Sequence, residues 1–283
     1  MTRTTIGLIK LVRLKQWIKN GFVFGPLVFS GLFREFDSIV LTIQAAAIFC
    51  LASSAVYILN DLQDIEADRR HPVKSTKRPL ASGEVSPQSA VVLLVCLYLS
   101  IAASWFVLPQ VVYVVVAYLL INVAYTLKLK QIAVVDIFAV ASGFVLRVYA
   151  GIVALQVEPS YWMLITTLCL ALYLAAIKRR QEMVSSGEEA RAVLQQYTLS
   201  LVDRYAEMSA TGALVFYSLF TLTVRPEMAV TVPFVLFGVY RYWYVVEMLE
   251  GGESPTDVLW TDWPLLGCVI AWVVAVLSVL GNS

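Results

Sequence analysis

The stretch that decides the fold is the apolar run Ser38–Leu59, followed directly by Asn60-Asp61-Leu62-Gln63-Asp64-Ile65-Glu66-Ala67-Asp68. The apolar run contains no charged residue and is long enough to cross a bilayer, which takes roughly 17–25 helical residues. The nine residues after it place four acids at the end of that span. This combination is more typical of an enzyme that gathers a metal and phosphates at one membrane face than of a structural protein.

The composition of the whole chain agrees with a membrane protein. Of its 283 residues, 59% are hydrophobic and 14% are charged, and the mean hydropathy is +0.76, whereas soluble proteins have roughly 45–50% apolar and about 25% charged residues. We therefore predict an all-α, polytopic membrane protein with one transmembrane domain over residues 1–283. Nine apolar runs are predicted to span the membrane: Trp17–Phe33, which Pro26 interrupts, Ser38–Leu59, Ser89–Leu108, Val111–Leu127, Ile132–Leu155, Ser160–Ile177, Ala206–Val224, Ala229–Tyr244 and Pro264–Leu280.

The positive charges indicate how the chain is oriented. All of its 21 Lys and Arg residues except Arg34, Arg147 and Arg225 lie in every second gap between the apolar runs or, for Lys19 and Arg241, near the end of a run that borders such a gap. By the positive-inside rule, the amino terminus is cytoplasmic and the carboxyl terminus is outside. The loops 60–88 and 178–205 are then cytoplasmic and are expected to form the active site, and residues 1–16 are expected to form an amphipathic helix on the inner membrane surface.

The charge and cysteine patterns also narrow the class of protein. The membrane composition makes nucleic acid an unlikely partner, so none is expected, and the net charge of +1 says nothing about partners because the positions of the charges matter more than their sum. The four cysteines all lie inside apolar runs without ligand-like spacing, which favours neither a disulfide framework nor a zinc site.

The acid cluster predicts a divalent metal site. If the helix of the second span continues, Asp61, Asp64 and Asp68 share one face. Like charges placed so closely repel each other unless a cation lies between them, and hard oxygen ligands favour Mg²⁺ held partly through a substrate's phosphates. Asn60 adds a further oxygen. The alternative interpretation is a solvated helix end whose charges bind nothing.

Basic residues near both long loops are candidates for phosphate recognition. Metal-bridged pyrophosphate keeps charge on its outer oxygens, which Lys and Arg can neutralise. The alternative is an ordinary basic membrane border that signals topology. The basic candidates are Lys74 and Arg78 in the first loop, and Lys178, Arg179 and Arg191 in the second. Tyr197, which follows Arg191 in the second loop, is included as a further candidate.

An ionisable residue also lies inside the fifth predicted span. Arg147 lies in one helical stripe with Asp136, Val140 and Gly143. A charge inside a span costs on the order of 2.5–3.5 kcal/mol by insertion scales and usually faces a wet cavity or a partner. Arg147 is therefore a candidate for lining the substrate cavity, and the alternative is an internal ion pair that only joins helices.

Four motifs together resemble the UbiA superfamily of intramembrane prenyltransferases. These are Trp17-Ile18-Lys19-Asn20, the Asn-Asp-x-x-Asp-x-x-x-Asp pattern at Asn60–Asp68, the run Arg78–Gly83, and Tyr125 with Lys130 after the fourth span. The resemblance implies nine helices around a central cavity that opens to the cytoplasm, with Mg²⁺ held by the aspartates. It adds Lys19, Asn20, Tyr125 and Lys130 to the expected substrate-binding residues.

The second loop departs from the usual family pattern. Most members carry a second aspartate motif there, but this chain has Lys178-Arg179-Arg180-Gln181-Glu182, in which Glu182 is the acid. A wider set of residues resembles a branch of the family whose donor is water-soluble phosphoribosyl pyrophosphate and whose acceptor is a polyprenyl monophosphate such as decaprenyl phosphate. The set is Gln16-Trp17-Ile18-Lys19-Asn20, Asp68 followed by His71-Pro72 and Lys74, Arg147, Lys178-Arg179 with Glu182, Arg191 with Tyr197, and Arg241-Tyr242. The resemblance implies a magnesium-dependent phosphoribosyltransferase of the bacterial inner (plasma) membrane that supplies cell-wall arabinan synthesis, with Glu182 among the substrate-binding residues.

Two other functions remain as alternatives at this point. A conventional member of the family would move a prenyl group from its diphosphate to an aromatic or other small acceptor, and it would consume prenyl diphosphate without phosphoribosyl pyrophosphate. A lipid transporter would tend to place its binding groups near the bilayer midplane, whereas the acids here lie at a helix end. A homo-oligomer also stays open, because lipid-facing and partner-facing apolar surfaces look alike in one sequence.

Overall fold

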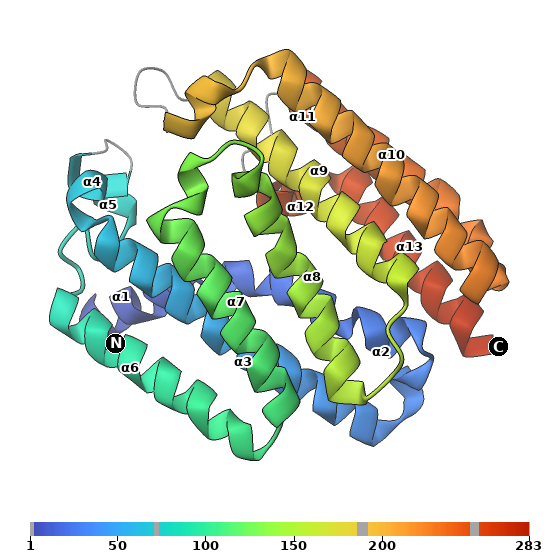
Figure 1. Ribbon diagram of the computed structural model, residues 1–283, viewed down its shortest axis with the longest axis horizontal. Helices are drawn as coiled ribbons and strands as arrows, with labels where there is room; N and C mark the ends of the chain where they lie inside the picture. Colours follow the sequence, from blue (N-terminus) through green and yellow to red (C-terminus); the bar gives the residue numbers. More distant parts are fainter. Residues whose placement is uncertain (1–2, 71–73, 186–191, 250–254, 283) are drawn as a thin grey trace.

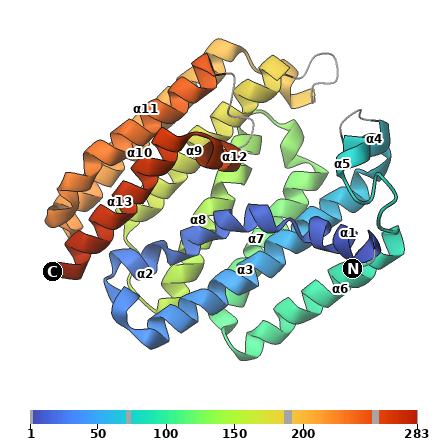
Figure 2. The ribbon, with the colours of Figure 1, turned by 180° about the vertical axis from the view of Figure 1, so that it is seen from behind.

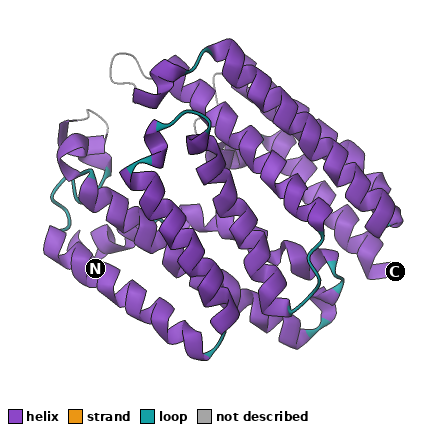
Figure 3. Cartoon of the chain, in the orientation of Figure 1, coloured by secondary structure: helices purple, strands orange, loops and turns teal. Residues whose placement is uncertain are grey.

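The computed structural model describes residues 3–70, 74–185, 192–249 and 255–282, and every regular element in them is a helix (Figures 1 and 3). The α-helices are α1 (Arg3–Val12), α2 (Gly25–Phe29), α3 (Phe36–Gln63), α4 (Ile65–Arg70), α5 (Lys74–Lys77), α6 (Pro87–Ala103), α7 (Pro109–Leu127), α8 (Val135–Leu155), α9 (Tyr161–Ser185), α10 (Leu199–Val224), α11 (Val232–Met248), α12 (Pro255–Thr261) and α13 (Trp263–Asn282). The 3₁₀ segments are η1 (Leu14–Phe24), η2 (Leu32–Arg34), η3 (Ser104–Phe106), η4 (Leu129–Gln131), η5 (Ala192–Gln196) and η6 (Pro226–Thr231).

Eight helices in the described part of the chain are long and apolar enough to cross a membrane. They match the second to ninth predicted spans, so the prediction of a polytopic all-α protein is confirmed. The eight spans are Phe36–Gln63, Pro87–Phe106, Pro109–Leu127, Val135–Leu155, Tyr161–Ser185, Leu199–Val224, Pro226–Met248 and Trp263–Gly281.

The first predicted span has a different form, so the number nine is only approximate. Residues Trp17–Phe33 do not make one α-helix but the 3₁₀ segment η1, the short helix α2 and the 3₁₀ turn η2. Pro26 lies in the first turn of α2, where its missing N–H costs least, and Gly31 has a positive φ of 84° that ends the helix. In Figure 2 this segment, the dark blue stretch between α1 and α2, runs across α3 and α8.

A glycine allows the broken segment to pack tightly on α8. A Cβ atom placed on Gly151 would lie only 2.1 Å from the carbonyl oxygen of Val23 and 3.0 Å from Pro26 Cγ. No larger residue fits there unless the backbone moves, because the nearest atom belongs to the main chain. Close packing on α8 therefore fixes the position of this segment, which has no single continuous α-helix.

The amino-terminal helix is shorter than the predicted helix over residues 1–16. It ends at Val12, and Arg13 follows with a left-handed backbone (φ 55°, ψ 52°). Leu11 is fully buried in a cluster that includes Ala55 and Ile58 of α3, while Ile6 is 43% exposed. One face of α1 is thus covered by protein, and the other faces outward.

The two long loops lie at the same end of the helix bundle, which we call the acid end. In Figure 1 the end of α3 with α4 and α5, and the end of α9 beside the start of α10, all lie toward the upper left, whereas the carboxyl terminus lies at the opposite end of α13. Two apolar clusters fix this arrangement. One joins α3, α7 and α8 around Phe49 and Val115, and the other joins α9, α10 and α11 around Tyr173 and Ile177.

Candidate active site

The acid cluster lies where the second predicted span leaves the apolar part of the bundle. The amide of Asp64 donates to the carbonyl of Asn60 (2.9 Å) and that of Asp68 to the carbonyl of Asp64 (2.8 Å), so helical hydrogen bonding continues from α3 into α4. Asp61 is 2% exposed and Asp68 is 4% exposed, whereas Asp64 is half-buried. Asp61 and Asp68 therefore both point into the protein, whereas Asp64 lies at the junction of α3 and α4 and is only half-buried.

Two arginines neutralise the buried acids. Arg78 donates through the same nitrogen, Nη1, to Asp61 Oδ1 (3.0 Å) and to Asp68 Oδ2. Arg13 donates through Nη2 to the same oxygen of Asp61 at 2.6 Å. Within the described ranges, no three Asp, Glu, His or Cys side chains are gathered closely enough to hold a metal ion.

The position of the Arg78 guanidinium nevertheless suits a divalent cation. Its Nη1 atom carries part of the positive charge of the guanidinium and forms ion pairs with both buried carboxylates. The oxygens that meet it belong to the carboxylates of Asp61 and Asp68, and carboxylate oxygens are ligands that Mg²⁺ prefers. The donor set of Asp61, Asp68, Asp64 and Asn60 thus fits magnesium in chemistry, provided that the arginines give way.

Helix α7 links the acid cluster to the second loop. Thr126 donates its hydroxyl proton to Asn60 Oδ1 (2.7 Å), and the neighbouring Tyr125 accepts a hydrogen bond on its OH from Arg179 Nη2 (2.9 Å). The predicted residues Asn60, Tyr125 and Arg179 are therefore brought together across three helices. Thr126 carries no motif that would single it out in the sequence.

Arg179 is the centre of a buried polar network. It is 3% exposed, and its Nε donates to Asp136 Oδ2 (2.6 Å) while Nη1 donates to Glu182 Oε2. The hydroxyl of Tyr197 donates to the other oxygen of Asp136 (2.7 Å) and accepts from the amide of Val134. Burial, together with the hydrogen bond to Asp136, raises the pKa of Tyr197 above its ordinary value. Arg179 and Tyr197 are thus committed to carboxylates of this protein.

Arg147 is buried without a carboxylate among its hydrogen-bond partners in the described structure. It is 5% exposed, and it donates from Nε to Asn20 Oδ1 (2.7 Å), from Nη1 to the carbonyl of Gly143 (2.8 Å) and from Nη2 to the hydroxyl of Tyr118 (3.3 Å). Its guanidinium carbon lies 5.0 Å from the ring centre of Tyr118, so the ring face also stabilises the charge. Asp136, which shares its helical stripe, pairs with Arg179 instead.

Lys19 joins the two parts of the site electrostatically. Its half-buried ammonium lies in the field of three cations, Lys178, Arg147 and Arg13, and of one acid, Asp257. We call Lys19, Arg13 and Lys178 the cationic region. Of these three cations, Arg13 also bonds to Asp61, so positive charge from the amino-terminal segment lies directly beside the acid cluster.

Three predicted basic residues remain: Lys74, Lys130 and Arg191. Lys74 on α5 and Lys130 on η4 are both half-buried. Arg191 lies outside the described residues, as do His71 and Pro72.

The roles of two described residues of the site, Arg13 and Asp136, were not predicted from the sequence. Both were visible only as charges beside or inside a predicted span.

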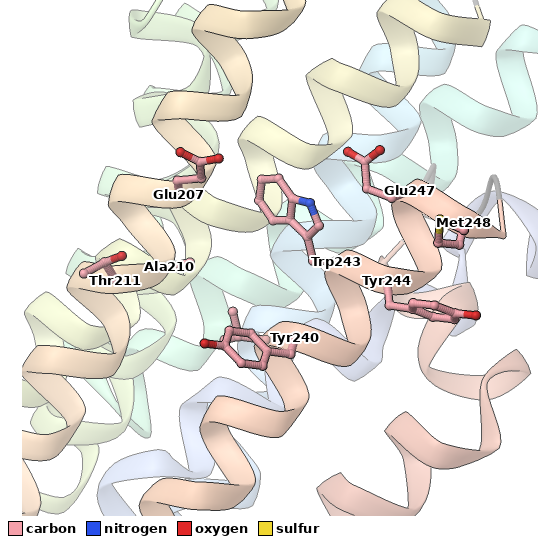
Figure 4. A pocket seen from close by; sticks show the side chains of 9 residues that line it. Glu207, Ala210, Thr211, Tyr240, Trp243, Tyr244, Glu247 and Met248 are labelled. Carbon is pink, nitrogen blue, oxygen red and sulfur yellow. The ribbon is translucent and has the colours of Figure 1, made fainter.

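A groove of about 490 Å³ lies elsewhere, between α10 and α11. Figure 4 shows Glu207 on one of these helices and Trp243, Tyr244 and Glu247 on the other. None of the predicted site residues lines this groove. It is therefore separate from the candidate active site.

Comparisons with known proteins agree with this architecture. Residues 23–256 match the UbiA prenyltransferase family. The decaprenyl-phosphate phosphoribosyltransferase of Mycolicibacterium smegmatis is 34% identical over 94% of this chain and 90% of its own length, and that of Corynebacterium glutamicum is 32% identical over 96% and 86%.

The fold of this chain also resembles the folds of solved structures. A UbiA homolog from Archaeoglobus fulgidus bound to DMAPP and Mg²⁺ superposes with a TM-score of 0.70 at 17% identity, over 97% of this chain and 99% of that one. A digeranylgeranylglyceryl phosphate synthase gives a TM-score of 0.69 at 18% identity, over 98% and 100%. The match over most of the chain, together with these relatives, shows that the chain belongs to the UbiA prenyltransferase family.

Proposed function

We propose that this protein transfers the 5-phosphoribosyl group of phosphoribosyl pyrophosphate to a polyprenyl monophosphate, such as decaprenyl phosphate, and releases pyrophosphate. The names of its relatives support this reaction. The structural observation that carries it is the second loop, where the family usually places a second metal-binding acid motif. Here Glu182, the acid that this motif retains, pairs with Arg179 and lies 3.9 Å from the ammonium of Lys178, so it is engaged by cations of the protein itself.

The chemistry requires one bond to form and one to break. An oxygen of the lipid phosphate bonds to the anomeric carbon of the ribosyl ring as the bond from that carbon to pyrophosphate breaks. Because the lipid phosphate is already ionised near neutral pH, no strong general base is needed. Catalysis then rests on positioning and on stabilisation of the charge that develops on the leaving pyrophosphate.

Magnesium is proposed as the cofactor. Asp61, Asp64 and Asp68 would hold it with help from Asn60, and when bound it would neutralise the charge of the departing pyrophosphate. The fit rests on the two buried carboxylates that meet at one nitrogen of Arg78. Arg78 would then be displaced toward the substrate's phosphate oxygens, where its fork of donors suits bidentate binding.

The basic residues are proposed to divide between the phosphates by position. Lys74 and Arg78 follow the acid helix directly, and Lys130 follows α7, whose Thr126 contacts Asn60, so these three are assigned to the donor's pyrophosphate. Lys19 and Lys178 belong to the cationic region and are assigned to the sugar 5-phosphate or the lipid phosphate. Arg191 is retained with this second group on sequence grounds.

The buried residues are proposed as positioning groups. Arg179, Glu182, Tyr197 and Tyr125 hold the start of the second loop against α7 and α8 through the Asp136 network. Asn20 and Arg147 hold the amino-terminal segment against α8, which places Lys19. These residues would influence the reaction by fixing the loops that carry the charged groups.

The cellular setting is also part of the proposal. The relatives are bacterial, and the eight apolar helices indicate a multi-pass membrane protein. We place it in the bacterial inner membrane with the acid end facing the cytoplasm, where the soluble donor is found, and with the carboxyl terminus outside. The product would serve the synthesis of cell-wall arabinan.

The reaction can be tested with purified protein. Incubation with Mg²⁺, phosphoribosyl pyrophosphate and a polyprenyl phosphate should give a lipid whose mass has increased by one phosphoribosyl group. Asp61→Asn and Asp68→Asn should each lower turnover by at least about a hundredfold, because each removes a charged ligand. Consumption of labelled prenyl diphosphate with no phosphoribosyl pyrophosphate present would favour the conventional prenyltransferase, and substrate movement without a covalent product would favour a transporter.

A further inference from the structure

The amino-terminal helix is anchored to the loop that follows the acid cluster. The ammonium of Lys10 lies 3.0 Å from both carboxylate oxygens of Glu84. Gly7 faces Val85 so closely that a Cβ atom on it would lie 2.5 Å from Val85 Cγ2. Leu11 is completely buried beneath this contact. Helix α1 therefore has a defined position over the acid end.

The residue that follows this helix is held in a strained conformation. Arg13 has a left-handed backbone, which costs a non-glycine residue on the order of 1–2 kcal/mol. Contacts fix the chain on both sides of it, because Ser54 Oγ donates to the carbonyl of Val12 (2.9 Å) and Trp17 Nε1 donates to Ser54 Oγ (3.1 Å). With the backbone in this conformation, the side chain of Arg13 reaches Asp61.

Arg13 and Arg78 share one oxygen of a proposed metal ligand. Asp61 Oδ1 accepts from Arg13 Nη2 at 2.6 Å and from Arg78 Nη1 at 3.0 Å. The guanidinium of Arg13 also lies over the ring of Tyr57, with its carbon 4.8 Å from the ring centre. A divalent cation on this oxygen would meet two positive charges at contact distance, so the cation and these two contacts exclude each other.

We infer that Arg13 competes with the divalent cation for Asp61 and moves to a phosphate of the donor when the cation binds. The inference rests on the proposed function. Arg13 and Arg78 meet on the same oxygen of Asp61, so a donor phosphate that takes up Arg78 when the cation binds also lies within reach of Arg13. The arrangement would keep metal affinity low until an anionic donor arrives, and it makes Arg13 a specificity residue for the phosphorylated donor.

The test measures metal binding and donor binding in the same variants of the full-length protein. Mn²⁺ binding without donor, followed by electron paramagnetic resonance, should be about tenfold or more tighter in Arg13→Gln, since a hydrogen bond to a charged group is lost from the metal-free state only. The KM for phosphoribosyl pyrophosphate at saturating Mg²⁺ should rise by about tenfold in the same variant, because a phosphate contact is lost. Arg13→Lys should lie between Arg13→Gln and wild type in both measurements.

Two further variants serve as a charge control and as a substitute in case Arg13→Gln does not fold. Arg69→Gln removes an equally charged side chain from the acid helix, where Arg69 pairs with exposed Glu66, and it should leave Mn²⁺ affinity and KM unchanged. If Arg13→Gln does not fold, Lys10→Gln loosens α1 without touching Asp61 and should shift Mn²⁺ affinity in the same direction by a smaller factor.

The outcomes separate this inference from the proposed function. Unchanged or weaker Mn²⁺ binding in Arg13→Gln, or in Lys10→Gln where that variant replaces it, overturns the competition. An unchanged KM for phosphoribosyl pyrophosphate in Arg13→Gln overturns the inference that the Arg13 side chain moves to a phosphate of the donor. Mn²⁺ binding that persists undiminished in Asp61→Asn overturns the metal site of the proposed function itself, as does a wild-type protein that binds no Mn²⁺ even when phosphoribosyl pyrophosphate is present.

Discussion

Replacing Asp136 with Asn is expected to destabilise the protein more than it affects substrate affinity. Asp136 has no exposed surface, and it accepts hydrogen bonds from Arg179 Nε (2.6 Å) and from the hydroxyl of Tyr197 (2.7 Å). Asn has the same shape but no charge, and its amide group cannot accept both bonds. The variant thus leaves the Arg179 guanidinium, only 4% exposed, with Glu182 as its remaining carboxylate.

The size of the effect follows from the burial of the pair. Breaking a buried ion pair by removing one partner typically costs 3–5 kcal/mol. Glu182 is 20% exposed and still pairs with Arg179, so the loss should lie near the lower limit, at about 3 kcal/mol. Since each kcal/mol lowers the midpoint of a chain of this size by roughly 2–4 °C, the unfolding midpoint should fall by about 6–12 °C.

Thermal unfolding in detergent can be followed by the reaction of a thiol dye with cysteines that become exposed. Cys96 is exposed and is blocked first, which leaves the half-buried Cys50, Cys169 and Cys268 as reporters. Glu66→Gln is the matched control, because it removes a carboxylate from an exposed pair and should change stability by less than about 0.5 kcal/mol.

The double variant Asp136→Leu with Arg179→Met should recover part of the lost stability, since an apolar pair leaves no uncompensated buried charge. The reasoning would be refuted if Asp136→Asn unfolded at the same temperature as Glu66→Gln. An increase in the KM for phosphoribosyl pyrophosphate without loss of stability would instead show that Arg179 acts on the substrate directly.

Two further predictions concern the broken amino-terminal segment. Gly151→Ala should cost about 1–3 kcal/mol, because its Cβ would collide with the carbonyl oxygen of Val23, whereas Gly238→Ala on α11 should be neutral or slightly stabilising, since nothing lies within 4 Å of its Cβ position. The same unfolding assay compares them, and equal midpoints would contradict the close packing described above. Arg147→Met should cost about 1–3 kcal/mol because it leaves buried Asn20 without its donor. Adding Asn20→Leu to Arg147→Met should lessen that loss, and a double variant no more stable than the single one would argue against this account.

Much of the architecture could be predicted because the bilayer imposes local rules. A run such as Ser38–Leu59 contains enough apolar residues to span hydrocarbon wherever it lies in the fold, and eight of nine such predictions correspond to helices. The burial of both Asp61 and Asp68 also follows from their seven-residue spacing along continuous helical hydrogen bonding. The first span differs because Pro26 and Gly31 allow a broken backbone, and its course then depends on packing against Gly151.

The partners of the charged residues could not be predicted in this way. Arg179 binds Asp136, 43 positions away, and Arg13 binds Asp61, 48 positions away, so both pairs exist only because separate helices meet at the acid end. Composition and spacing show that a charge is present but not which neighbour satisfies it. The primary structure therefore decided where the membrane lies and which end of the bundle carries the acids, since hydrophobic length and helical period act within one segment. The packing of distant helices decided which cation each buried acid meets, because the compensation of a buried charge depends on contacts between segments.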